Sequence, residues 1–332
     1  MHVYIIAEAG VNHNGHLELA LRLCDAAKAA GVDAVKFQTW KTENIVTASA
    51  RQAAYQTENT GKAESQYDML KRLELSYEHF SKIQTYCKQI GIDFLSTPDE
   101  EESLEFLMSL NLPFIKIGSG EVTNIPYLRT IGSKRKPVIL STGMSNLAQV
   151  ATAYDTLMQA GASSVALLHC TTNYPCPYEE VNLRAMQTLK DAFKCQVGYS
   201  DHTMGTEIPV AAVAMGAEIV EKHFTLDRTM EGPDHKASLE PAELKEMVQQ
   251  IRHIEMALGD GIKRPNKSEA ENAKVVQKSI LAKRPIKMGE ILAEDMLVAK
   301  RAGTGISAKY WDMVIGAYAI KDFKIDEPIV LW

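Results

Sequence analysis

The chain has 332 residues, of which 45% are hydrophobic and 23% are charged, and its formal net charge at pH 7 is −6. These totals are ordinary for a globular protein and leave room for one large domain and a small one. The acidic balance argues against nucleic-acid binding, which usually needs a basic surface. No apolar run reaches membrane-spanning length and no signal peptide is recognisable, so we expect no membrane partner. Five scattered cysteines without a CxxC motif indicate a reducing, cytoplasmic location.

Eight short apolar runs alternate with amphipathic segments such as HLELALRLCDAAKAAG (16–31), in which apolar residues recur at helical spacing. Alternating strands and helices indicate parallel strands that are buried on both faces. Eight such units predict a (β/α)₈ TIM barrel. A doubly wound open sheet is the alternative, although no GxGxxG motif follows the first run. The predicted strands are Val3–Glu8, Ala34–Gln38, Phe94–Thr97, Phe114–Ile117, Pro137–Ser141, Val165–His169, Gln196–Ser200 and Glu218–His223.

The barrel pattern stops after Leu258, which predicts a catalytic barrel over residues 1–258. Residues 259–272 (GDGIKRPNKSEAEN) are polar and contain glycine, so they predict a linker with room for a short helix. Residues 273–332 contain short strand-like pieces separated by turns such as KMGE. We therefore expect a small, mainly β domain at the C-terminal end of the chain.

Two histidines stand at the ends of the last two predicted strands, His202 in SDHT and His223 in EKHFT. TIM-barrel active sites lie at the C-terminal ends of the strands, and neighbouring strands are about 4.8 Å apart. The two imidazoles could therefore share one metal ion, with Mn²⁺, Mg²⁺ and Zn²⁺ as candidates. Two protein ligands would leave coordination positions open for a substrate. The alternative is a hydrogen-bonded pair of histidines at the barrel mouth.

Two lysines, Lys36 and Lys116, follow apolar runs at the same end of the barrel. A buried lysine is costly unless it meets an anion, so both favour an anionic ligand. Strand-end hydroxyl groups, together with the glycines of KIGSGE, could cradle a phosphate. Lys116 could instead form a Schiff base, as in a class I aldolase. The hydroxyl residues are Thr97, Ser119, Ser141 and Ser200.

Three carboxylates, Glu8, Glu121 and Glu221, are expected at this mouth and are the candidates for general acid and base catalysis. Glu221 could instead belong to a structural ion pair. His169 and Cys170 are expected to pack at the end of the sixth strand rather than to bind metal.

The predicted barrel contains the motifs IAEAGVNHNG, VKFQT, LSTP, KIGSGE, ILSTGM, LHCTTNYP, GYSDHT, EKHFTLD and GPDHKASLEP, and the small domain contains KRAGTGIS. With these motifs the chain resembles the sialic acid synthase family over essentially its whole length. That family condenses phosphoenolpyruvate with an N-acetylated mannosamine-type sugar to give a nine-carbon 2-keto acid. The motif KRAGTGIS resembles part of the family's small antifreeze-like (SAF) domain.

The resemblance implies roles for individual residues. His202 and His223 would hold Mn²⁺ or Mg²⁺, and Glu121 would transfer a proton. Arg301 would reach over the barrel of a partner subunit, which implies a domain-swapped homodimer. The residues implied in phosphoenolpyruvate binding are Lys36, Thr97, Lys116, Ser119, Ser141 and Ser200. Those implied on the sugar side are Gln38, Tyr174 and Asp234.

The chain departs from the family pattern in two places. Some members read CTNIYP where this chain reads CTTNYP, so either Thr172 or Asn173 could contact the phosphate. Members often read KRPGNG where this chain has Ala302 and Thr304, which leaves the loop of Arg301 less restrained.

The motifs EGPDHKASLEP and AAYQTENTGKAESQ resemble bacterial members that make N,N′-diacetyllegionaminate or N-acetylneuraminate. We expect the legionaminate activity, with the neuraminate activity as the alternative. A Schiff-base aldolase that uses Lys116 is a second alternative. A carbohydrate- or ice-binding protein that uses the C-terminal module is a third, but it leaves the polar cluster at the barrel mouth unexplained.

Overall fold

The computed structural model describes residues 2–61 and 64–332 and contains two compact units. The first unit ends at Gly259 and the second runs from Asp260 to Trp332. Residues 62 and 63, inside the motif AAYQTENTGKAESQ, lie outside the described part of the chain. Among the described residues, no helix is both long and apolar enough to cross a membrane.

The first unit is built on an eight-stranded parallel sheet with the order β3-β2-β1-β8-β7-β6-β5-β4. The two end strands of this order, β3 and β4, lie against each other. The predicted TIM barrel is therefore confirmed, and every predicted strand is observed to within one or two residues. The strands are β1 (Tyr4–Gly10), β2 (Ala34–Thr39), β3 (Asp93–Pro98), β4 (Ile115–Ile117), β5 (Pro137–Ser141), β6 (Ser164–Cys170), β7 (Val197–Asp201) and β8 (Ile219–His223).

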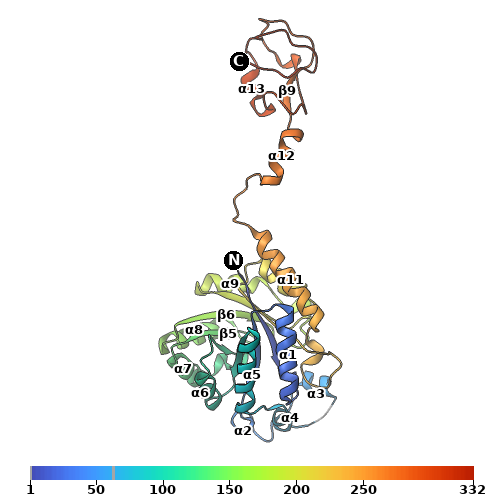
Figure 1. Ribbon diagram of the computed structural model, residues 1–332. Coiled ribbons are helices and arrows are strands. Elements are labelled where there is room, and N and C mark those ends of the chain that lie inside the picture. The colour runs from blue at the N-terminus through green and yellow to red at the C-terminus, as the bar shows by residue number, and fades with distance from the viewer. Residues whose placement is uncertain (1, 62–63) are drawn as a thin grey trace. The chain divides into compact units, whose positions relative to one another are not determined.

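Helices cover the outside of the strands, with α1 packed between α5 and α11 (Figure 1). The helical faces pack with the outward-facing strand residues into one large apolar core. The helices around the barrel are α1 (Leu17–Ala30), α5 (Tyr77–Ile90), α6 (Glu101–Ser109), α7 (Ile125–Ser133), α8 (Leu147–Ala160), α9 (Arg184–Phe193), α10 (Glu207–Ala214) and α11 (Pro241–Leu258).

A second, smaller apolar cluster fills the inside of the barrel. Because side chains alternate between the two faces of a strand, the residue two positions further on points into the same interior. Ile6 is thus followed by Glu8, Ala34 by Lys36, and Ile219 by Glu221. The apolar layer supports a polar layer at the mouth. Its buried members are Ile6, Ala34, Leu95, Ile139, Ala166, Leu168 and Ile219.

The longest connection of the barrel joins β2 to α5 and carries three short helices. Asn59 in the second of them donates a hydrogen bond to the backbone oxygen of Pro233 (2.7 Å). This bond attaches the connection to the loop after β8, beside Asp234. The helices are α2 (Thr42–Ile45), α3 (Ala54–Thr60) and α4 (Gln66–Leu73).

The second unit is a small domain around the antiparallel strands β9 (Ser279–Ala282) and β10 (Leu297–Lys300). Isolated bridges such as Ile286–Phe323 and Ile291–Tyr318 add further strand-like pairings, as expected of a mainly β domain. Helix α12 (Lys267–Val276) precedes the sheet and begins inside the residues predicted as a linker, and α13 (Trp311–Val314) follows it. The unit has its own apolar core, which includes Ile280, Leu297 and Phe323.

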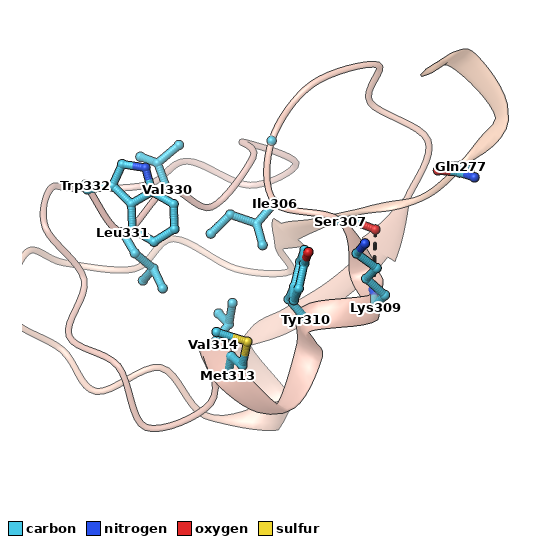
Figure 2. A pocket seen from close by; sticks show the side chains of 11 residues that line it. Gln277, Ile306, Ser307, Lys309, Tyr310, Met313, Val314, Val330, Leu331 and Trp332 are labelled. Atoms are coloured by element: carbon cyan, nitrogen blue, oxygen red, sulfur yellow. Dashed lines mark hydrogen bonds between the residues drawn. The ribbon is translucent and has the colours of Figure 1, made fainter. Parts of the chain in front are cut away.

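A groove of about 880 Å³ opens on this second unit (Figure 2). Its wall is formed mainly by apolar side chains, among them Ile306, Met313 and Leu331. Lys309 is the charged residue that lines the groove. Among the described residues, no Asp, Glu or His side chain lines it. Lys309 and Tyr310 are the ionisable side chains that line the groove, whereas the barrel mouth gathers several carboxylates, lysines and histidines.

Candidate active site

Four ionisable side chains form a continuous chain of charges at the barrel mouth. Lys36 Nζ lies 2.7 Å from Glu8 Oε2 and 3.7 Å from Glu221 Oε1. Lys116 Nζ lies 3.5 Å from the same oxygen of Glu221. All four side chains are buried. At these distances an incoming anion could replace a carboxylate as the charge partner of the lysines.

The pKa values of these groups separate their roles. Burial, together with the nearby charge of Glu221, raises the pKa of Glu8 to about 7 even though Lys36 opposes the shift. Burial also opposes the charge of Glu221, but Lys116 and Lys36 outweigh it and lower the pKa of that carboxyl. Burial lowers the pKa of Lys116. Glu221 therefore stays charged near neutral pH, whereas Glu8 can gain or lose a proton there.

Two of the predicted hydroxyl groups accept hydrogen bonds from the lysines. Thr97 Oγ1 accepts a hydrogen bond from Lys36 Nζ (3.1 Å), and Ser141 Oγ accepts one from Lys116 Nζ (2.8 Å). Ser200 is buried and is the strand partner of Glu221 in the β7–β8 ladder. The structure thus brings the lysines and these hydroxyls together in one place, as an anion site requires.

A tight corner beside this cluster is built around Gly143. Its backbone N–H donates to Ser119 Oγ (2.9 Å). A Cβ atom on Gly143 would lie only 2.2 Å from Thr172 Oγ1, so this position requires glycine. The Thr172 hydroxyl is buried and has no hydrogen-bond partner among the described residues. Asn173 is instead exposed, and its Oδ1 accepts from the backbone N–H of Tyr174 (3.1 Å). Thr172, and not Asn173, therefore presents a free polar group to this corner.

The two predicted metal ligands lie side by side. The ring centroids of His202 and His223 are 5.3 Å apart, and the Tyr174 ring lies 4.0 Å from His202 and 5.5 Å from His223. The Nδ1–H of His202 donates to the Thr171 carbonyl (2.7 Å), which leaves Nε2 with the free lone pair. His223 Nδ1 is buried without a hydrogen-bond partner among the described residues.

Charge state also decides whether a histidine can bind metal. Burial, His202 and the nearby lysines hold the pKa of His223 well below its usual range, so this ring is neutral. Burial opposes the charge of His202, but Cys170 outweighs it and raises the pKa, so a proton competes with a metal there. In the described part of the chain no cluster of three or more His, Cys, Asp and Glu could hold a metal. The two adjacent rings alone would supply two ligands, so an ion held there would take its other ligands from substrate or water.

Two of the predicted sugar-side residues, Gln38 and Asp234, lie beside Gly10. The β1–β2 ladder shifts its register between Glu8 and Gly10, and Gly10 has a positive φ of 51°. A Cβ atom there would meet Glu8 Oε1 at 3.3 Å, and Asp234 Oδ2 and Gln38 Nε2 at 3.6 Å each. Gln38 Nε2 donates to Glu8 Oε1 (3.0 Å), and Asp234 Oδ2 lies 3.8 Å from His223 Nδ1. Burial raises the pKa of Asp234 to about 6.

Two predicted residues lie outside this cluster of contacts. Glu121 is half-buried on a short 3₁₀ helix, Ser119–Thr123, and accepts a hydrogen bond from Asn124 (2.6 Å). Burial raises the pKa of Glu121. Arg301 belongs to the second unit and is exposed there.

The structure adds Asp99, which sequence reasoning missed, and places in the site Cys170, which was expected only to pack at the end of the sixth strand. Asp99 directly follows β3, and burial together with Glu121 raises its pKa to about 7. The rule that selected the other strand-end residues could have found it. Cys170 Sγ lies 3.7 Å from His202 Nδ1 and 3.8 Å from Ser119 Oγ, so this thiol is part of the site. His169 packs as expected, with Nε2 bonded to the Val181 carbonyl (2.7 Å).

The sequence of this chain matches the models of two known protein families. The model of the NeuB family matches residues 23–263, and the model of the SAF domain matches residues 277–331. The chain belongs to the NeuB family. It is 52% identical to the N,N′-diacetyllegionaminic acid synthase of Campylobacter jejuni, with 98% of each chain covered. It is 46% identical to the enzyme of the same name from Legionella pneumophila, with 96% of this chain and 90% of that one covered.

A solved structure supports the same membership in the NeuB family. The N-acetylneuraminic acid synthetase of Leptospira borgpetersenii, solved with citrate, is 36% identical to this chain and superposes with a TM-score of 0.72. The match covers 82% of this chain and 91% of that one. The resemblance stated from the motifs is therefore confirmed, and it extends through both units.

Proposed function

We propose that this NeuB-family protein condenses phosphoenolpyruvate with an N-acetylated mannosamine-type sugar and water to a nine-carbon 2-keto acid and phosphate. The sugar we propose is the diacetamido sugar that leads to N,N′-diacetyllegionaminate. The two synthases of that name are 52% and 46% identical to the chain, against 36% for the N-acetylneuraminic acid synthetase. The observation that carries the proposal is one barrel mouth that holds both a paired-lysine anion site and two adjacent histidines.

Phosphoenolpyruvate would bind where the lysines meet the strand-end hydroxyls. Lys36 and Lys116 supply the charge for its carboxylate and phosphate, and Thr97 and Ser141 already hold the ammonium groups in place. The free hydroxyl of Thr172 is the group that we assign to the phosphate, in place of Asn173. Such contacts act mainly by positioning the alkene and stabilising charge.

The metal site would be formed by His202 and His223, whose free nitrogens fit a divalent ion, Mn²⁺ or Mg²⁺. When bound, such an ion supplies Lewis acidity toward the aldehyde oxygen of the open-chain sugar. The sugar would be held by Tyr174, which lies beside the histidines, and by Gln38 and Asp234, which lie beside Gly10.

The three carboxyl groups would have different roles in the reaction. In the reaction, C3 of phosphoenolpyruvate bonds to the aldehyde carbon, water adds at C2, and phosphate leaves by C–O cleavage. Glu8, with a pKa of about 7, is populated in both protonation states at neutral pH, which suits a group that moves protons. Glu221 stays charged and anchors the two lysines. Glu121, at the edge of the mouth, is the candidate for proton transfer to the incoming substrate.

Assembly and location complete the proposal. We propose a homodimer in which Arg301 of each subunit completes the barrel mouth of the other. We also propose a cytoplasmic enzyme, which is supported by its five free cysteines, because cytoplasmic thiols remain reduced.

The function is tested by assaying the purified protein with phosphoenolpyruvate, Mn²⁺ and each sugar in turn, with the product identified by mass. We expect N,N′-diacetyllegionaminate from the diacetamido sugar, slower turnover of N-acetylmannosamine, and no product from a folded His223→Ala variant. Preferred turnover of N-acetylmannosamine would establish the neuraminate activity instead. Covalent trapping of substrate on Lys116 by borohydride would establish a Schiff-base aldolase.

A further inference from the structure

A fully buried ion pair lies on the outer side of the two strands that carry the histidines. Lys222 Nζ is 2.5 Å from Asp201 Oδ2, and both side chains are completely shielded from solvent. The two residues are direct partners in the β7–β8 ladder. Within the described part of the chain, the hydrogen bonds and ion pairs of these two side chains join them to each other and to Thr203, and not to the residues of the barrel mouth described above.

This ion pair fixes the backbone on both sides of His202. Asp201 Oδ1 accepts from the backbone N–H of Thr203 (3.0 Å), and Asp201 Oδ2 accepts from the Thr203 hydroxyl (3.0 Å). Lys222 Nζ donates to the backbone oxygen of Thr203 (2.5 Å). The residue before His202 and the residue after it are therefore held by one buried network.

The same network fixes His223 because Lys222 immediately precedes it in β8. Side chains alternate along a strand, so Lys222 points outward while its neighbours Glu221 and His223 point into the mouth. One ion pair thus joins the positions next to both histidines, and it does so from outside the site.

We propose that Asp201 and Lys222 are positioning residues that set the spacing of His202 and His223 for a divalent metal. The inference rests on the proposed function, because it assumes that these histidines bind the ion. A buried ion pair is weak support for a purely stabilising role, since apolar replacements of such pairs are often neutral or stabilising. Residues that orient metal ligands, by contrast, commonly affect metal affinity.

The test compares Mn²⁺ affinity in several variants, measured by titration calorimetry and by the electron paramagnetic resonance of free Mn²⁺. The main variant is Asp201→Asn with Lys222→Met, which removes both charges together and keeps an acceptor for the Thr203 N–H. The matched control is Arg252→Met, which breaks ion pairs to Asp33 and Glu255 elsewhere on the barrel. His202→Ala serves as the reference for loss of a metal ligand.

We expect the double variant to fold, by circular dichroism, and to bind Mn²⁺ about 10-fold more weakly, the low end of the range for residues behind metal ligands. Its KM for phosphoenolpyruvate should change less than its Mn²⁺ affinity, because the lysines lie on β2 and β4 and not on the strands of the ion pair. Arg252→Met should lower thermal stability without changing Mn²⁺ affinity. Should the double variant fail to fold, Asp201→Asn alone is expected to weaken Mn²⁺ binding in the same direction.

Two results would overturn the inference. One is wild-type Mn²⁺ affinity in a folded double variant, or in folded Asp201→Asn if the double variant does not fold. The other is an equal loss of affinity in Arg252→Met, which would show a general effect of destabilisation. A failure of the proposed function looks different: the wild-type protein would then bind Mn²⁺ no better than His202→Ala does.

Discussion

His13 follows β1 and is completely buried, with Nδ1 accepting a hydrogen bond from the backbone N–H of Gly15 (3.0 Å). Its Nε2 has no hydrogen-bond partner among the described residues. Burial, with His16 and His235 nearby, lowers its pKa to about 3. The unfolded chain therefore binds a proton at this residue at pH values where the folded chain does not.

The consequence is a loss of stability in mild acid. The contribution of neutral His13 is fully present above the unfolded pKa of about 6.5 and falls as the pH drops from there toward 3. At pH 5 the loss is roughly 2 kcal/mol. His13→Gln should flatten the fall in the free energy of unfolding between pH 7 and pH 5, measured by urea denaturation. The exposed His253→Gln is the control, and an unchanged pH profile in His13→Gln would contradict the assignment.

At the residue scale, the positions of strand-end side chains can be predicted from the sequence, whereas their roles stay predictions. The structure brings five of them to one mouth: Lys36, Thr97, Ser141, His202 and His223. What the sequence could not show is which groups pair. The chain of charges through Glu221 depends on the packing of strands that are distant in sequence, and only the folded barrel reveals it.

At the scale of elements, the strands were the easiest to predict, because parallel strands buried on both faces give continuous apolar runs. The β2–α5 connection was not predicted, because α2, α3 and α4 are only four to eight residues long. Helices of that length span only one or two turns, so they depend on tertiary contacts for stability. The bond from Asn59 to Pro233 is one such contact.

The loop after β6 carries a prediction that separates two adjacent residues. Thr172→Val keeps the shape of the side chain and removes the free hydroxyl beside Gly143. If this hydroxyl binds the phosphate, the lost hydrogen bond to a charged group is worth about 1.5–3 kcal/mol, so the KM for phosphoenolpyruvate should rise about 10- to 150-fold. Steady-state kinetics with the sugar held at saturation measure this change.

Asn173→Ala is the matched control for Thr172→Val, since Asn173 is exposed and its oxygen already accepts from Tyr174. We expect it to change the KM for phosphoenolpyruvate little. The reverse result, a large rise in Asn173→Ala and none in Thr172→Val, would assign the phosphate contact to Asn173.

At the scale of the whole molecule, the connection between the units sets how far the small domain can reach. The residues from Asp260 to Asn266 can extend at most about 3.3–3.6 Å each, and the ten residues of α12 add about 1.5 Å each. Together they span at most roughly 40 Å. This length allows the small domain to act either on its own barrel or on that of a partner subunit.

A subunit-mixing experiment distinguishes these two arrangements. Arg301→Ala chains and His223→Ala chains are each expected to be nearly inactive, and they are combined under conditions that allow exchange. If Arg301 completes the partner's site, each heterodimer has one site with both lesions and one with neither, so activity should recover toward half per heterodimer. If Arg301 serves its own barrel, both sites remain damaged, and mixing restores no activity.

Strand β8 places Glu221, Lys222 and His223 in succession, with the middle one outward and the other two inward. A one-residue slip in its pairing would turn Lys222 into the mouth and force Glu221 and His223 into the apolar layer against the helices. On that side Asp201 would lose Lys222 and would lie near Glu221, which carries the same charge, so the slipped barrel would bury unpaired charges at high cost. The charged residues that we propose for the reaction would therefore also disfavour misaligned closure of the barrel during folding.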